Sequence, residues 1–238
     1  MKKIYLYTAA VCMGGFLGFS AYAGDEDEAK EMAILFSSGR AVISDNQAHI
    51  NNAELGDKAL TGDAVVAKAK EKYKEKTGKD VVDTDPNQKA ILDAISEVMK
   101  DAQPLINEKG KGFKGFLPAV FAGQVATKAS EKLAGKAIIK LTAPKELVRN
   151  RKNRPDDWEN KAIEETFKKA GYEKGKPFSE TTTADGKSAF RYIQPEYYGQ
   201  SCLSCHGEPK GETDISGGKK EGAKLDDLGG AISVTLFK

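Results

Sequence analysis

One short motif constrains this chain more than any other feature. Cys202, Cys205 and His206 lie within the segment YYGQSCLSCHGEPKG, although the whole chain of 238 residues holds only three cysteines and two histidines. C-x-x-C-H is the attachment signature of c-type haem, because its two thiols add to the two vinyl groups of the porphyrin. The adjacent histidine then binds the iron as its proximal ligand. The motif therefore predicts one covalently attached haem c.

Two other kinds of site use the same residue types. A redox dithiol or disulfide also has C-x-x-C spacing, but it usually lies where a strand enters a helix in a βαβ unit, whereas this motif follows a predicted hairpin and precedes a glycine-rich loop. A structural zinc site needs four ligands, and apart from the motif the chain after residue 23 offers only the distant His49. The pattern favours haem over both alternatives.

The N-terminus has the pattern of a secretory signal peptide over residues 1–23. Lys2 and Lys3 form a charged start, residues 4–19 are mostly apolar, and residues 21–23 form an A-x-A cleavage pattern. The apolar run is short for a membrane span, which needs about 20 residues. We therefore predict cleavage, export to a bacterial periplasm and no membrane span in the mature chain. Covalent haem attachment needs export, so the two features support each other.

Composition and charge narrow the classes of function. The chain is 39% hydrophobic, as expected for one globular domain, and loss of Lys2 and Lys3 with the signal leaves 35 basic and 35 acidic residues. A nucleic-acid-binding protein would carry a basic excess concentrated on one face, so no nucleic-acid partner is expected. No pair of catalytic residues accompanies the motif, so the chain is not expected to be an enzyme.

The region 24–135 is predicted to be helical. Apolar residues recur every three or four positions in four segments, which run from residue 32 to about residue 50 and over 63–76, 86–106 and 118–133. In addition, QAHINNAELGDK (47–58) matches QPLINEKGKGFK (103–114) at an offset of 56 residues. This match hints at two similar helix-loop-helix hairpins.

The region 136–238 is predicted to hold an antiparallel sheet of about four strands, with helices packed on one side. Strand patterns cover 136–143 and 230–237, and Asp185-Gly186 is a strong signal for a hairpin turn between two further strands. A helix is expected over 154–171, with Pro155 in its first turn. The fold class is therefore α+β.

The other face of the iron has several candidate ligands. A sixth ligand favours electron transfer, whereas an open face favours the binding of a small gas. His49 lies at the boundary of the apolar stripe on its helix, about 80° from the centre of that stripe. Met32 and Met99 are further candidates, but a methionine on an apolar helix face is more often core filling.

Three segments together resemble a known bacterial family. LVRNRKNRPDDWENKAIEETF, FRYIQPEYYGQSCLSCHGEP and LGGAISVTLF resemble single-haem c-type cytochrome domains with a PAS-like fold, which occur as exported proteins and as extracytoplasmic domains of sensor kinases. The resemblance covers about residues 136–237 and rests on the Asn-x-Pro-Asp-x-Trp-Glu and Cys-x-x-Cys-His-Gly patterns. It implies a haem packed between the sheet and the N-terminal helices, attached through Cys202 and Cys205 and bound by His206.

The chain departs from this family at the opposite haem face. Some members use a cysteine of the first helix as the opposite ligand, and a loose alignment puts that position at or beside Asn46, where this chain has no cysteine. Three alternatives stay open. His49 takes over, a methionine such as Met99 does so, or the face is open and Asn46 or Gln47 hydrogen-bonds a bound diatomic molecule.

Two functions follow as expectations. The first is periplasmic electron transfer through a His-ligated haem, with a redox partner protein. The alternative is a haem-based sensor of redox state or of NO, CO or O2, which would act through a signalling partner because the chain carries no kinase. A homodimer is an arrangement that the sequence leaves open.

Overall fold

The computed structural model of the chain describes residues 17–238, with side chains from residue 24 onward. The predicted signal peptide, residues 1–23, lies for the most part outside the described residues. No helix among the described residues is long and apolar enough to cross a membrane.

The first half of the chain forms a layer of helices, as predicted. These are α1 (Leu17–Asp45), α2 (Gln47–Ile50), α3 (Gly62–Thr77), α4 (Pro86–Ile106) and α5 (Pro118–Lys132). The predicted first helix is divided at Asn46, whose Nδ2 donates to the carbonyl oxygen of Val42 at 2.7 Å. Such a side chain competes with the helical backbone for hydrogen bonds. The apolar stripe still continues across the break, since Val42 and Ile50 are both fully buried.

The loops after α2 and after α4 hold each other through reciprocal hydrogen bonds. Oδ1 of Asn51 accepts from the backbone N–H of Lys114 at 3.1 Å, and Oδ1 of Asn107 accepts from the backbone N–H of Lys58 at 3.0 Å. Asn51 and Asn107 differ by 56 positions, and so do Lys58 and Lys114. The offset noticed in the sequence therefore corresponds to a pseudo-twofold arrangement of two hairpins.

A second pair of contacts follows the same offset. Nε2 of Gln47 donates to the carbonyl oxygen of Phe116 at 3.3 Å, and Nε2 of Gln103 donates to that of Leu60 at 2.9 Å. The two halves differ in one respect. Oε1 of Gln103 accepts from Asn107 at 3.0 Å, whereas Oε1 of Gln47 is buried and has no hydrogen-bond partner among the described residues.

Both reciprocal asparagines should contribute to stability, and Asn107 should contribute more because its Nδ2 also donates to Gln103. Asn51→Ala and Asn107→Ala each remove the acceptor of a loop N–H, and we expect each to lower the free energy of unfolding by about 1–2 kcal/mol. Asn52→Ala is the matched control, because Asn52 is exposed and its side chain accepts from the N–H of the nearby Glu54, while its carbonyl oxygen, which accepts from Nζ of Lys58, is kept in the variant. Urea unfolding measures all three variants. An effect of Asn52→Ala as large as the other two would contradict a special role for the reciprocal bonds.

The second half of the chain forms a four-stranded antiparallel sheet, and the predicted α+β class is confirmed. The strands are β1 (Ala137–Thr142), β2 (Phe178–Ala184), β3 (Lys187–Tyr197) and β4 (Leu228–Phe237), in the order β1-β4-β3-β2. Asp185 and Gly186 join β2 to β3 with φ angles of 50° and 74°. Two positive φ angles are typical of a type I′ turn, which matches the twist of the two strands.

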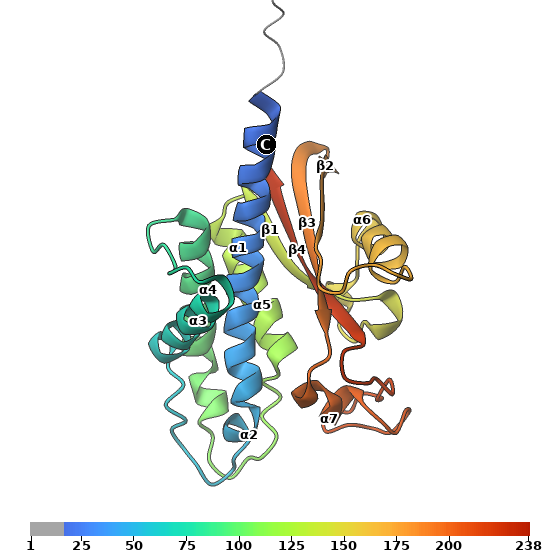
Figure 1. Cartoon of the computed structure of the whole chain (residues 1–238). Coiled ribbons are helices and arrows are strands. Elements are labelled where there is room, and N and C mark those ends of the chain that lie inside the picture. The colour runs from blue at the N-terminus through green and yellow to red at the C-terminus, as the bar shows by residue number, and fades with distance from the viewer. Residues whose placement is uncertain (1–16) are drawn as a thin grey trace, which may run out of the picture.

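The sheet is covered on both faces, so the prediction of helices on one side only was wrong (Figure 1). Ile232, Val234 and Leu236 of β4 join the large core formed with the N-terminal helices. The opposite face holds a second core, in which residues of α6 (Asp157–Lys161) and of the π-helix Ala162–Phe167 contact the sheet. Its buried members are Ala162, Ile163, Phe167, Ile193 and Ala231.

The helix on this second face begins later than predicted. Asp156 is its N-cap, and Asp156 and Glu159 form a capping box, so Pro155 precedes the helix instead of lying in its first turn. The segment then changes to a π-helix at Ala162 and ends at Phe167, before the predicted end at residue 171. The capping box satisfies backbone N–H groups at the start of the helix, and this explains why the helix starts at Asp157.

The Asn-x-Pro-Asp-x-Trp-Glu segment has a structural role at this place. Nη2 of Arg191 on β3 lies 2.7 Å from Oδ2 of Asp156, and its guanidinium lies 4.3 Å from the ring centre of Trp158. Oε2 of Glu159 lies 2.6 Å from Nζ of Lys140 on β1, and only 1% of the Glu159 side chain is exposed. The segment therefore joins α6 to β1 and β3 through a partly buried ion-pair cluster.

Candidate functional site

The cysteine-histidine motif lies just beyond the end of β3. The 3-10 turn Gln200–Cys202 and the short helix α7 (Leu203–His206) carry it, near the lower part of α1 in Figure 1. Both cysteines are partly exposed free thiols. A Cβ on Gly207 would approach the carbonyl oxygen of Leu203 to 2.6 Å, which explains why glycine follows the histidine. This turn presents two thiols and an imidazole from five consecutive residues.

The imidazole of His206 is fixed through its Nδ1 atom. Nδ1 lies 2.8 Å from Oε2 of Glu221, and the ring stacks on Tyr198 with a centroid distance of 4.9 Å. Because a carboxylate only accepts, Nδ1 carries the hydrogen and donates it. In the neutral imidazole Nε2 then keeps its lone pair, and it has no hydrogen-bond partner in the described part of the chain. Such a histidine suits the coordination of iron through Nε2.

The donor set therefore fits the predicted haem. Two free thiols suit attachment to two vinyl groups, and one unoccupied imidazole nitrogen suits the iron. Within residues 17–238, no group of three or more His, Cys, Asp or Glu residues is placed to hold a metal ion by itself.

The glycine-rich loop after the motif folds back over it. Nε of Arg149 lies 2.8 Å from Oε1 of Glu221, and Nη2 donates to the carbonyl oxygen of Cys205 at 2.8 Å. Nη1 of the same side chain binds the carboxylate of Asp214. Arg149 therefore joins the segment after β1, the motif and the loop, which wraps the site.

Two carboxyls of this loop have shifted pKa values. Burial raises the pKa of Glu221, but hydrogen bonds from Arg149 and His206 outweigh it and hold the pKa below its ordinary value. Burial also opposes ionisation of Asp214, whose side chain is fully buried, yet hydrogen bonds from Ser216 and Arg149 hold its pKa far below the ordinary value. Both groups are therefore anionic at neutral pH.

Acid should weaken the loop through Asp214. A carboxyl whose folded-state pKa is depressed contributes stability above its unfolded pKa of about 3.9, and this contribution is lost as the pH falls through the folded-state value. We expect Asp214→Asn to destabilise the protein near neutral pH, with a difference from the unchanged protein that shrinks as the pH falls below about 4. Urea unfolding at several pH values measures this difference. Asp93→Asn is the control, because Asp93 forms an exposed pair with Lys89.

Helix α1 contacts residues that precede the motif through two polar side chains. Oγ of Ser44 lies 3.1 Å from Oγ of Ser201, and Arg40, one turn earlier, forms an ion pair with Glu196 at the end of β3. Burial lowers the pKa of Arg40, and an electrostatic interaction with Cys202 opposes this effect in part. Neither residue was expected at the site from the sequence, although a polar pair at i and i+4 in an apolar helix was a usable signal.

The predicted residues of the opposite haem face have their own partners elsewhere in the helical layer. Nε2 of His49 forms a 2.9 Å hydrogen bond with the carbonyl oxygen of Lys58, and Met99 is fully buried in the core. Asn46 lines a hollow between α1 and α3. None of the predicted distal residues, including Gln47, forms a hydrogen bond or ion pair with Cys202, Cys205 or His206 in the described chain. A distal ligand therefore stays a prediction.

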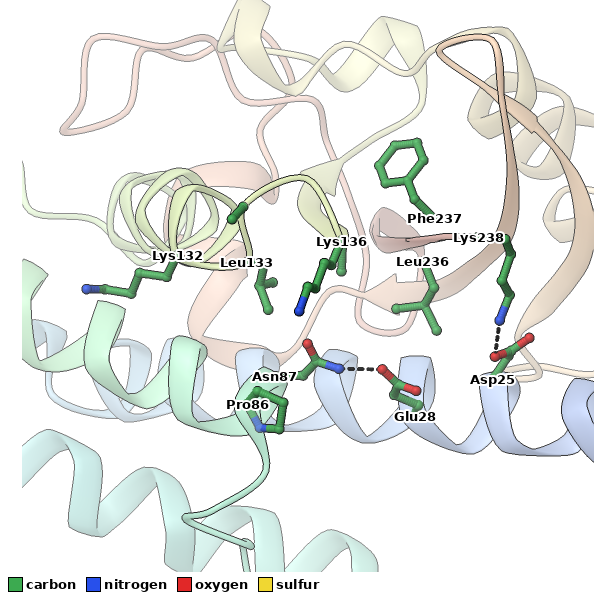
Figure 2. Close-up of a pocket in the computed structure, with 12 residues that line it drawn as sticks. Asp25, Glu28, Pro86, Asn87, Lys132, Leu133, Lys136, Leu236, Phe237 and Lys238 are labelled. Atoms are coloured by element: carbon green, nitrogen blue, oxygen red, sulfur yellow. Dashed lines mark hydrogen bonds and ion pairs between the residues drawn. The ribbon is translucent and has the colours of Figure 1, made fainter.

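A cavity of about 350 Å³ is lined by residues near the C-terminus (Figure 2). The C-terminus and α7, which carries the motif, lie at opposite ends of the fold (Figure 1). Its charged groups are largely paired, since Lys238 binds Asp25, Asn87 binds Glu28 and Lys132 lies 2.5 Å from Glu97. No cysteine or histidine lines it. This cavity therefore plays no part in the candidate site.

One known protein family matches nearly the whole of the described chain. A family model described as Tll0287-like matches residues 28–236, which include the helices, the sheet and the motif. No curated protein and no solved structure matches the chain significantly.

Proposed function

The chain belongs to the Tll0287-like family, and on this premise we propose that it is an exported haem c protein that transfers single electrons in the periplasm. The family supports a haem-binding domain. The observation that carries the proposal is the state of His206, whose Nδ1 is held by Glu221 while Nε2 is free beside two free thiols. The proposal assigns the chain no catalytic role.

Each residue of the site has a distinct part in this proposal. Cys202 and Cys205 would hold the haem through thioether bonds, and His206 would bind its iron through Nε2. When bound, the haem supplies an iron that accepts and releases one electron. Tyr198 limits rotation of the imidazole by stacking on it, and the hydrogen bond to Glu221 selects the tautomer.

The absorption spectrum of the purified protein tests this proposal. The chain is produced with its N-terminal segment in a bacterial host that matures c-type cytochromes, and the periplasmic fraction is purified. We expect a covalently bound haem that is reduced and reoxidised reversibly in a one-electron titration. A folded periplasmic protein with two free thiols and no haem would contradict the proposal.

A haem-based sensor is a second candidate, favoured by the contacts between α1 and residues that precede the motif. Ser44 of this helix contacts Ser201, which directly precedes the motif. Arg40 forms an ion pair with Glu196, near the end of β3. A change of iron coordination that moves the motif would therefore be transmitted to α1. This function requires a small gas or a redox change as its signal and a partner protein as its receiver.

Carbon monoxide or nitric oxide separates the two functions. If the iron is six-coordinate and serves electron transfer, the spectrum of the ferrous protein should not change when either gas is added. Immediate binding, together with altered hydrogen exchange of the amides in α1, would favour the sensor.

A further inference from the structure

The histidine of the motif is hydrogen-bonded to a fixed charge. Oε2 of Glu221 lies 2.8 Å from Nδ1 of His206, and the same carboxylate receives two bonds from Arg149, from Nε to Oε1 at 2.8 Å and from Nη2 to Oε2 at 3.0 Å. Only 18% of the Glu221 side chain is exposed. Both carboxylate oxygens are thus occupied, and the group cannot rotate away from the imidazole without breaking charge-assisted bonds.

The arginine that holds this carboxylate is itself fixed by the motif and the loop. Nη2 of Arg149 also donates to the carbonyl oxygens of Cys205 at 2.8 Å and of Lys219 at 2.9 Å. Its Nη1 binds Asp214, a fully buried carboxylate. One guanidinium thus lies between two carboxylates, and the three side chains together carry one net negative charge next to His206.

We propose that Glu221, positioned by Arg149, tunes the haem iron by making His206 a stronger donor and thereby favouring the ferric state. This inference rests on the proposed function. A carboxylate that accepts the Nδ1 hydrogen raises the basicity of the other ring nitrogen. Ferric iron carries one more positive charge than ferrous iron, so a stronger donor and a nearby net negative charge stabilise it more.

The cation of Arg149 opposes this effect only in part. Its charge is shared between Glu221 and Asp214, so it cannot neutralise both carboxylates. The redox step is the gain of one electron by ferric iron from a one-electron donor protein, which gives ferrous iron. No bond to the protein is formed or broken in this step, and the hydrogen on Nδ1 of His206 stays in place.

Glu221→Gln tests the inference, because glutamine keeps the size and the hydrogen-bond acceptor but removes the charge. At a fixed potential we expect the ratio of ferric to ferrous protein to fall about tenfold, which corresponds to a rise of about 59 mV in the midpoint potential. The control is Glu212→Gln, the same change in the same loop, at an exposed residue that pairs with Lys220. Its midpoint potential should match that of the unchanged protein.

A second variant tests the same inference if Glu221→Gln does not fold or does not bind haem. Glu221→Asp keeps the charge but withdraws it from Nδ1 by one methylene group, so its midpoint potential should lie above that of the unchanged protein and below that of Glu221→Gln. If all variants bind haem and have the same midpoint potential, the inference is overturned and the proposed function stays intact. Absence of haem from the unchanged protein would instead overturn the proposed function.

Discussion

The double variant Cys202→Ser/Cys205→Ser should accumulate without any covalently bound haem. Serine oxygen does not replace the cysteine thiolate as the nucleophile, so neither vinyl group can be joined to the chain. Both thiols are free and partly exposed, so each is accessible for attachment. Haem staining after denaturing electrophoresis and the mass of the intact protein measure the loss. This is the largest effect that we expect on the cofactor.

Two further variants sharpen this result. Ser204→Ala changes an exposed residue between the two cysteines, whose hydroxyl donates to the carbonyl oxygen of Ser201 and contacts Sγ of Cys205 at 3.8 Å. The variant keeps both thiols, so it should retain its haem. His206→Ala should alter the spectrum of any haem that remains attached, because the iron loses its protein ligand. Haem that stays covalently bound to the double variant would contradict the assignment of the attachment residues.

Glu159→Ala should cause the largest loss of stability outside the apolar core. The carboxylate is 1% exposed and binds Lys140, while its second oxygen lies 3.6 Å from Nη2 of Arg191. Removing Glu159 leaves Lys140 without a carboxylate partner and Arg191 with Asp156 alone, and we expect the free energy of unfolding to fall by about 3 kcal/mol. The capping box with Asp156 is lost as well. Urea unfolding of the haem-loaded protein measures the change.

The control for this prediction lies on the same segment. Glu165 is exposed and belongs to the π-helix that follows α6, so Glu165→Ala removes the same charge without breaking the cluster. We expect its unfolding free energy to stay within about 0.5 kcal/mol of the unchanged protein. Equal effects of the two variants would show that the ion cluster does not stabilise the contact between α6 and the sheet.

The helices were the most predictable part of the fold. The predicted segment 86–106 coincides with α4, where Asp85 caps the first turn and Pro86 occupies a position that tolerates proline. These signals are local, since a cap and an apolar period both act within a few residues. The break at Asn46 was missed, because it depends on the choice of an asparagine side chain between solvent and the carbonyl oxygen of Val42.

The strands of the sheet could be predicted from the sequence, but the helices that cover its second face could not. Alternation placed Ile232, Val234 and Leu236 on one face, and they lie together in the large core. The same alternation does not say what covers the opposite face. There Ile193 and Ala231 are buried only because α6 and the π-helix pack onto them. The sequence likewise did not show why two segments match at an offset of 56 residues. The structure explains the match through the reciprocal hydrogen bonds of Asn51 and Asn107.

The sequence alone predicts the chemistry of the motif, and the tertiary structure decided what surrounds it. Cys202, Cys205 and His206 need only one turn of backbone to come together, so their spacing is sufficient to predict a haem c. Glu221 is 15 residues from His206, and Arg149 is 56 residues from Cys205. Many carboxylates and cations were available as partners, and only the closure of the loop over the motif selects these two. Ion pairs depend on distance in space, which spacing along the chain does not specify beyond one turn.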